Sequence, residues 1–261
     1  MFTGFSCQQT VTKTSTINSD STDTVVSNTS RNISVTKPFS NNSVDNPFRV
    51  SGQARVFENV VSWRLKDSGG NQIASGTTEA MAPDIGQFGA FDFWVVVPAV
   101  DDKNITLEVF QASAKDGSDT DLVSAPLALK RTDSTRLDLY FHNNDLDPEI
   151  SCTKVFSITK NIITTQSPAR AAMIMLLQGS SDSERETNYY SAIPFRSFLK
   201  DISLSDDGVA TVDLGGAVAG PLGGSCLVGG IAAEIENTLK QFPEVKEVKI
   251  LIDGKENALQ P

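Results

Sequence analysis

Apolar and polar residues alternate most regularly between Asn46 and Leu65, which read NPFRVSGQARVFENVVSWRL. A short polar break at Glu58-Asn59 divides the stretch into two runs. Large apolar side chains share one parity within each run: Val50, Ala54 and Val56, then Val61, Trp63 and Leu65. Because side chains of a strand switch faces at every residue, the pattern predicts two half-buried β-strands. The stretch holds no nucleophile–base pair or phosphate loop, so it predicts packing and not catalysis.

Short runs of the same kind continue to residue 130, separated by turn-forming Asp, Gly, Asn and Pro. About seven strands with turns every 8–12 residues or so are typical of an immunoglobulin-like sandwich. We therefore predict such a domain over residues 33–130, with Trp63 in its core. Its predicted strands are Ile33–Phe39, Phe48–Phe57, Val60–Lys66, Gln72–Thr78, Phe88–Val97, Ile105–Ala114 and Leu122–Leu129.

The periodicity changes in the second half, where strands and helices mix. Ser167 and Pro168 predict a helix start, with Ser as N-cap and Pro in the first turn, and Gly179 predicts its end. A polar loop, Ser180–Asn188, follows. The order ββαββαβ predicts an α+β domain over residues 135–254, with two helices on one mixed sheet. Its other elements are Leu137–Phe141, Lys154–Ile163, Leu199–Leu204, Val209–Leu214, Leu227–Gln241 and Val245–Ile252, before a tail at 255–261.

Residues 1–32 have the composition of a disordered tether. Ser, Thr and Asn dominate from Gln8 to Asn32, and such a segment cannot bury enough apolar surface to fold. A cysteine followed by a long polar tether is typical of a bacterial lipoprotein after signal cleavage, which makes Cys7 a candidate lipidation site. Phe5 and Gly4 fit the cleavage motif poorly, and the basic and apolar regions of a signal peptide are missing. Either the true start lies upstream, or Cys7 is an incidental thiol.

The net charge of −10 and the pI near 4.6 exclude a nucleic-acid partner, because phosphate backbones require basic patches. The same balance disfavours docking on anionic lipid. No apolar run approaches the roughly 18–20 residues that span a bilayer. We therefore expect membrane contact only through a lipid anchor.

Candidate chemistry is sparse. Three cysteines and one histidine make a four-ligand zinc site improbable, and Cys152 and Cys226 form either one disulfide or two buried thiols. The glycine-rich run Gly215–Gly230 lacks the Gly-Lys-Ser/Thr ending of a phosphate loop. Ser225 lacks the second glycine of a nucleophile elbow. We expect no catalytic residue, cofactor or metal. The acidic residues Asp145, Asp147 and Glu149 are more typical of a solvated loop than of a calcium site.

Four residues are candidates for an interaction surface. Arg55 and Glu58 lie near a strand end, where a local ion pair or backbone contacts are the simpler structural explanation. Tyr189 and Tyr190 are predicted to lie in the polar loop after the first helix, where paired tyrosines make good contact residues. Packing of Tyr190 on the sheet is the structural alternative.

The first domain contains a distinctive series of short motifs: Pro47-Phe48-x-Val50-Ser51-Gly52-x-Ala54, Trp63-Arg64-Leu65, Asp67-x-Gly69, Phe88-Gly89-x-Phe91-x-Phe93 and the run from Leu107 to Ser118. In these motifs and their order it resembles the immunoglobulin-like domain of bacterial spore-germination proteins. The resemblance implies an extracytoplasmic binding or scaffolding module without catalysis.

The second domain also contains a series of motifs: Ala169-Arg170-Ala171-Ala172, Leu176-Leu177-x-Gly179, Ser191-Ala192-Ile193-Pro194, Asp207-Gly208-x-Ala210-x-Val212-Asp213-Leu214, Asn237-Thr238-Leu239-x-Gln241-Phe242 and Val245-x-x-Val248-x-Ile250-x-Ile252-Asp253-Gly254. With these motifs and its order of elements, it resembles the sporulation and spore-germination (GerMN) domain. That family is similar in fold to ring-building modules of envelope secretion assemblies. The resemblance implies protein or cell-wall contact outside the membrane, and no catalytic residue carries over.

Together these features predict a non-enzymatic, extracytoplasmic envelope protein that binds a protein assembly or the cell wall. One rival is a cell-wall hydrolase that uses two carboxylates, Asp207 and Asp213. Both lie in a predicted hairpin where folding already explains them. The other rival is a self-assembling ring subunit, which would be a homo-oligomer.

Overall fold

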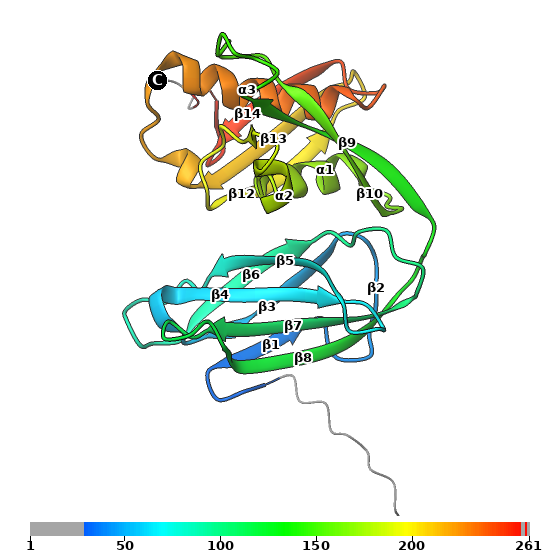
Figure 1. Ribbon diagram of the computed structural model, residues 1–261, viewed down its shortest axis with the longest axis vertical. Helices are drawn as coiled ribbons and strands as arrows, with labels where there is room; N and C mark the ends of the chain where they lie inside the picture. The colour runs from blue at the N-terminus through cyan, green and yellow to red at the C-terminus, as the bar shows by residue number, and fades with distance from the viewer. Residues whose placement is uncertain (1–28, 257–258, 260–261) are drawn as a thin grey trace, which may run out of the picture.

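The chain folds into two lobes with separate apolar cores (Figure 1). The computed structural model describes residues 29–256 and residue 259, so Cys7 and most of the predicted tether lie outside the described residues. The lower lobe in Figure 1 consists mainly of strands, and the upper lobe carries the helices. Strand β9 (Ser134–Asn143) begins at the junction of the lobes, and strand β10 (Phe156–Ile163) ends there.

Two sheets face each other in the first lobe and bury one apolar cluster between them. Within the described residues, hydrogen bonds order the smaller sheet as β1-β3-β6 and the larger as β2-β8-β7-β4-β5. The strands are β1 (Ile33–Lys37), β2 (Ser43–Val44), β3 (Phe48–Ala54), β4 (Val60–Lys66), β5 (Gln72–Glu79), β6 (Gly89–Val95), β7 (Asn104–Ala112) and β8 (Asp119–Leu129). The predicted sandwich is confirmed, although β2 was missed because two residues cannot show alternation.

The alternating stretch that predicted the sandwich forms β3 and β4. The apolar side chains that share one face of each strand are buried, including Val50, Val61 and Leu65, all at 0% exposure. Trp63 is 3% exposed and stacks on Phe93 with ring centres 5.5 Å apart. Gly76 faces it on β5, where a Cβ would lie 2.8 Å from the indole ring. A glycine is therefore required beside the tryptophan.

The second lobe has two sheets, and its long helices contact strands of both. Helix α1 (Pro168–Leu177) contacts β9 and β12, and α3 (Gly224–Lys240) contacts β9 and β14. The sheets are β10-β9-β11 and β12-β13-β14-β15, with β13 and β14 parallel. The predicted single sheet was wrong, because β10 and β11 pair with β9, whereas β12 to β15 pair only among themselves. The remaining elements are α2 (Asp182–Arg185), β11 (Tyr189–Tyr190), β12 (Ser197–Leu204), β13 (Val209–Gly216), β14 (Glu247–Ile252) and β15 (Lys255–Glu256).

Three local predictions need correction. Ser167 precedes α1, but its hydroxyl makes no capping hydrogen bond. The loop predicted at Ser180–Asn188 contains the short helix α2, whose start Ser181 and Glu184 stabilise as a capping box. Helix α3 begins at Gly224 and not at Leu227, so part of the glycine-rich run is helical. No helix in the described part of the chain is both long and apolar enough to cross a membrane.

The early start of α3 has a tertiary cause. A disulfide joins Cys226 in its first turns to Cys152, which resolves the alternatives that the sequence left open. One turn further along, a Cβ on Gly230 would lie 2.9 Å from Nε2 of His142 on β9. Close packing against β9 and its following loop therefore selects small residues where local propensity disfavours a helix.

Glu234, two turns after Cys226, is fully buried on α3. Its carboxyl group accepts hydrogen bonds from the Ser191 hydroxyl (2.6 Å) and the Ala192 N–H (2.7 Å). Nε2 of His142 lies 3.7 Å from the carboxyl and has no hydrogen-bond partner among the described residues. Burial raises the pKa of Glu234 to about 8, against the opposing effect of the two hydrogen bonds.

Asn46 joins the two lobes through a buried side-chain amide. Its Oδ1 accepts from the N–H of Val97 (2.8 Å), and its Nδ2 donates to the carbonyl of Ile163 (2.6 Å). The N–H of Ile163 in turn donates to the carbonyl of Val97 (3.1 Å). The cores interlock at the same point, because Ile163 packs in the core of the first lobe and Val96 in that of the second.

The first prediction concerns Glu234. An unfolded glutamate ionises near pH 4.5 and the folded one near pH 8, so Glu234 makes the free energy of unfolding fall as pH rises between these values. The loss is at most about 1.4 kcal/mol per pH unit. In urea denaturation, Glu234→Gln should gain stability relative to the wild type between pH 5 and pH 8. Glu236→Gln, exposed on the same helix, is the control, and an equal difference at both pH values for Glu234→Gln would contradict the assignment.

The second prediction concerns Asn46. Replacement by alanine leaves the N–H of Val97 and the carbonyl of Ile163 without their side-chain partner. We expect Asn46→Ala to lower the free energy of unfolding by about 2–4 kcal/mol. Asn161→Ala, exposed on β10, should change it by less than about 0.5 kcal/mol. Equal effects of the two variants in chemical denaturation would refute the role of Asn46.

Candidate functional site

The predicted pair Arg55 and Glu58 does not form an ion pair. The Arg55 guanidinium donates to Oδ1 of Asn32 (2.8 Å) and lies 5.0 Å from the ring centre of Phe88. Glu58 is exposed at the turn between β3 and β4 with φ of +51°, and it takes part in none of the ion pairs among the described residues. Arg55 therefore fastens the start of the sandwich, where Asn32, predicted to be in the tether, also binds Asp121.

Tyr189 and Tyr190 lie on strand β11 and not in a loop. They pair with Asn143 and His142 at the end of β9. Tyr189 packs against the core of the second lobe, whereas Tyr190 stacks on His142 with ring centres 5.4 Å apart and stays 37% exposed. Of the two tyrosines, Tyr190 is the one that presents its ring to a partner.

The acidic loop uses its carboxylates to hold its own backbone. Asp145 accepts from Nδ2 of Asn188 (2.8 Å), and Asp147 accepts from the N–H (2.6 Å) and hydroxyl (2.9 Å) of Ser151. Nowhere in residues 29–256 do three or more His, Cys, Asp or Glu residues form a group that could hold a metal ion. The bonded geometry explains the loop without calcium.

The two carboxylates of the hydrolase alternative are far apart. Asp207 lies in the turn before β13, and Asp213 lies on the strand, so the rise from Val209 to Asp213 alone is about 13 Å. Paired carboxylates of glycosidases are about 5–10 Å apart. Each is already bonded, Asp207 to the Ser205 hydroxyl and Asp213 to the N–H of Gly254 (2.9 Å). They do not form an acid–base pair.

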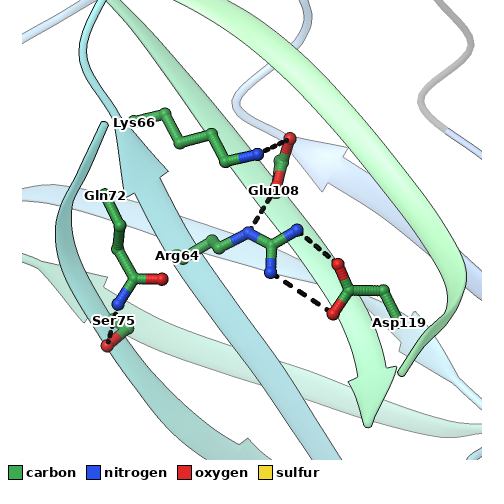
Figure 2. Close-up of polar contacts among 6 residues, drawn as sticks. All are labelled: Arg64, Lys66, Gln72, Ser75, Glu108 and Asp119. Carbon is green, nitrogen blue, oxygen red and sulfur yellow. Dashed lines mark hydrogen bonds and ion pairs between the residues drawn. The ribbon is translucent and has the colours of Figure 1, made fainter. Parts of the chain in front are cut away.

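An ion network that sequence reasoning missed lies on the outer face of the larger sheet (Figure 2). Arg64 on β4 binds Glu108 on β7 (2.5 Å) and forms two hydrogen bonds to Asp119 on β8, and Lys66 also binds Glu108 (2.9 Å). The Phe110 ring lies 4.5 Å from the guanidinium. The pKa of Arg64 is raised, chiefly by the hydrogen bond to Asp119. The sequence shows that Arg64, Lys66 and Glu108 occupy polar positions of alternating runs, but only the strand register places Arg64 opposite Glu108.

An open hollow of about 250 Å³ lies at the lobe junction beside Asn46. Lys130, Arg131 and Arg170 bring positive charge to its lining, and the acidic lining residue, Asp45, pairs with Lys130 at 2.7 Å. Trp94 forms one wall, where the guanidinium of Arg170 lies 5.6 Å from its ring. The described lining therefore offers mainly polar and cationic contacts. Its segments are far apart in the chain, so the sequence could not reveal it.

Comparison with known proteins gives the same two domains. No curated protein matches the chain. Two solved structures of the sporulation protein GerM from Bacillus subtilis are similar to it. The tandem GerMN domains are 17% identical over 48% of this chain, with a TM-score of 0.35, and the chain covers 41% of their length. The first GerMN domain is 18% identical over 47% of this chain and 85% of that one, with a TM-score of 0.34.

Family matches cover most of the described residues. Residues 32–118 match the immunoglobulin-like domain of bacterial spore germination, and residues 138–258 match the sporulation and spore germination family. Both resemblances seen in the sequence are confirmed. Residues 32–118 therefore form an immunoglobulin-like domain of bacterial spore germination, and residues 138–258 form a sporulation and spore germination (GerMN) domain.

Proposed function

We propose that this chain is a non-enzymatic envelope protein that acts outside the cytoplasmic membrane as a binding or scaffolding module. The observation that carries the proposal is the interlocked junction. Ile163 packs in the core of the first lobe, Val96 packs in the core of the second, and Asn46 bonds both backbones. Domains joined by a small polar contact move independently, whereas shared cores hold two binding faces in one orientation. A fixed orientation is what a scaffold needs.

The disulfide supports an extracytoplasmic location. Cys152 and Cys226 join a loop to helix α3 across 74 residues of sequence. Disulfides of this structural kind persist in oxidising compartments and are rare in the cytosol. A lipid on Cys7 would anchor the protein at the membrane surface, and the polar segment that follows would hold the lobes away from it.

The proposed partner is an envelope protein assembly or the cell wall. Tyr190 offers an exposed ring on the second lobe, and the junction hollow offers cationic side chains in an otherwise acidic protein. The hydrolase alternative has less support, since Asp207 and Asp213 are separated along β13 and bonded elsewhere. The second candidate is a self-assembling ring subunit of an envelope complex, which would be a homo-oligomer.

Crosslinking in intact cells tests the binding role. A photoreactive amino acid at Tyr190 should capture a specific envelope component, because this ring is 37% exposed beside a rigid strand. The same residue at Leu204, 46% exposed at the far end of β12, is the matched control. The same products from both positions, or none from Tyr190, would count against Tyr190 as a contact.

The anchor is tested separately on a full-length clone. Radiolabelled fatty acid should enter the wild-type protein and not the Cys7→Ser variant, because lipidation of a lipoprotein requires the cysteine thiol. Equal labelling of both, or of neither, would exclude Cys7 as the anchor.

A further inference from the structure

The junction hollow gathers positive charge although the protein as a whole is acidic. The chain has 32 acidic and 22 basic side chains. The hollow reverses this balance, because its lining includes three cationic side chains, Lys130, Arg131 and Arg170, and one carboxylate, Asp45. A cleft lined mainly by one sign of charge raises the local concentration of the opposite ion. The lining therefore favours an anionic ligand.

Ion pairs within the protein leave part of this positive charge uncompensated. Asp45 pairs with Lys130 at 2.7 Å, and Asp201 on β12 pairs with Arg170 at 2.9 Å. Both bonds that Arg170 forms with β12 use Nη2, so its other guanidinium N–H groups are left for a ligand. The Arg131 side chain forms none of the ion pairs or side-chain hydrogen bonds that link the described residues. Three cations against two carboxylates leave one positive charge at the hollow.

Neutral hydrogen-bond donors complete the lining. Residues Thr164–Ser167, between β10 and α1, contribute hydroxyl and amide side chains to it. A phosphoryl group has at least three strong acceptor oxygens, whereas a carboxylate has two. Arginines on two sides of a site can bind such a group through charge-assisted hydrogen bonds. A lining this rich in donors therefore suits a phosphoryl group better than a carboxylate.

We propose that the junction hollow is a phosphoryl-binding site in which Arg131 of the first lobe and Arg170 of the second bind the same group. The group belongs to free phosphate or to a phosphorylated polyol of the envelope. This inference rests on the proposed binding function and specifies the chemistry of one ligand. Because both lobes contribute, the site exists only in the lobe orientation that Asn46 fixes.

The size of the hollow and the charge of the protein favour a small ligand. Its volume of about 250 Å³ is below the roughly 300–1,000 Å³ of sites for drug-sized molecules. A protein partner would instead cover a broad surface of about 800 Å². The net charge of −10 repels a long polyanion, whereas a single phosphoryl group meets the local positive charge.

An NMR titration of the full chain tests the site with inorganic phosphate, glycerol 3-phosphate and uncharged glycerol. Both phosphates should shift the backbone amides of Lys130, Arg131 and residues 164–167, with a dissociation constant of about 1 mM, because few bonds form in an open hollow. Glycerol should shift none of them. Tighter binding of glycerol 3-phosphate would support a phosphorylated polyol as the source, and equal or tighter binding of inorganic phosphate would support free phosphate.

Charge removal locates the site. Arg131→Gln should raise the dissociation constant for either phosphate at least about fivefold, because it removes the unpaired cation. Unchanged amide shifts elsewhere in the spectrum show that this variant is folded. Lys115→Gln is the matched control and should leave the constant unchanged. It makes the same charge change at an exposed position before β8, roughly 30 Å along that strand from Arg131.

Three outcomes would overturn the proposal: no amide shifts at about 20 mM phosphate, equal effects of the two variants, or tighter binding of tri-glutamate than of phosphate. The last result would identify an acidic peptide as the occupant. None of these outcomes changes the expected crosslink at Tyr190, so failure of the phosphoryl site is distinguishable from failure of the proposed binding role.

Discussion

The two-lobed structure depends on the buried amide of Asn46. An amide presents a donor and an acceptor a fixed distance apart, so it can satisfy two backbones only when they hold one relative position. Here these backbones belong to the end of the sandwich at Val97 and the end of β10 at Ile163. A buried backbone group that lost its hydrogen bond to Asn46 would cost its full desolvation free energy. This cost favours one orientation of the lobes over others.

Polar groups elsewhere also hold the elements of the fold in position. Glu234 holds the segment before β12 against α3, and the Arg64 network ties three strands of the larger sheet together on their outer face. The carboxylates of Asp147, Asp207 and Asp213 likewise accept structural hydrogen bonds. The Tyr190 ring and the junction hollow remain accessible and suit contact with other molecules.

Much of the fold followed from local pattern. Alternation located the strands of the sandwich, and Pro168 and Gly179 located both ends of α1, because their causes are confined to a few adjacent residues. The division of the second lobe into two sheets did not follow, since strand pairing leaves no local trace in a sequence. Local sequence also did not show which of the four candidate contact residues are occupied within the fold: Arg55 binds Asn32, and Tyr189 packs against the core.

The sequence by itself determined that the chain has two domains of known families, a polar N-terminal segment and little chemistry, because composition and periodicity record burial directly. Tertiary structure alone decided that Cys152 meets Cys226, that Arg64 faces Glu108, and that the two cores exchange Ile163 and Val96. The physical reason is distance along the chain. Contacts between residues tens of positions apart depend on register and docking, which no single segment encodes.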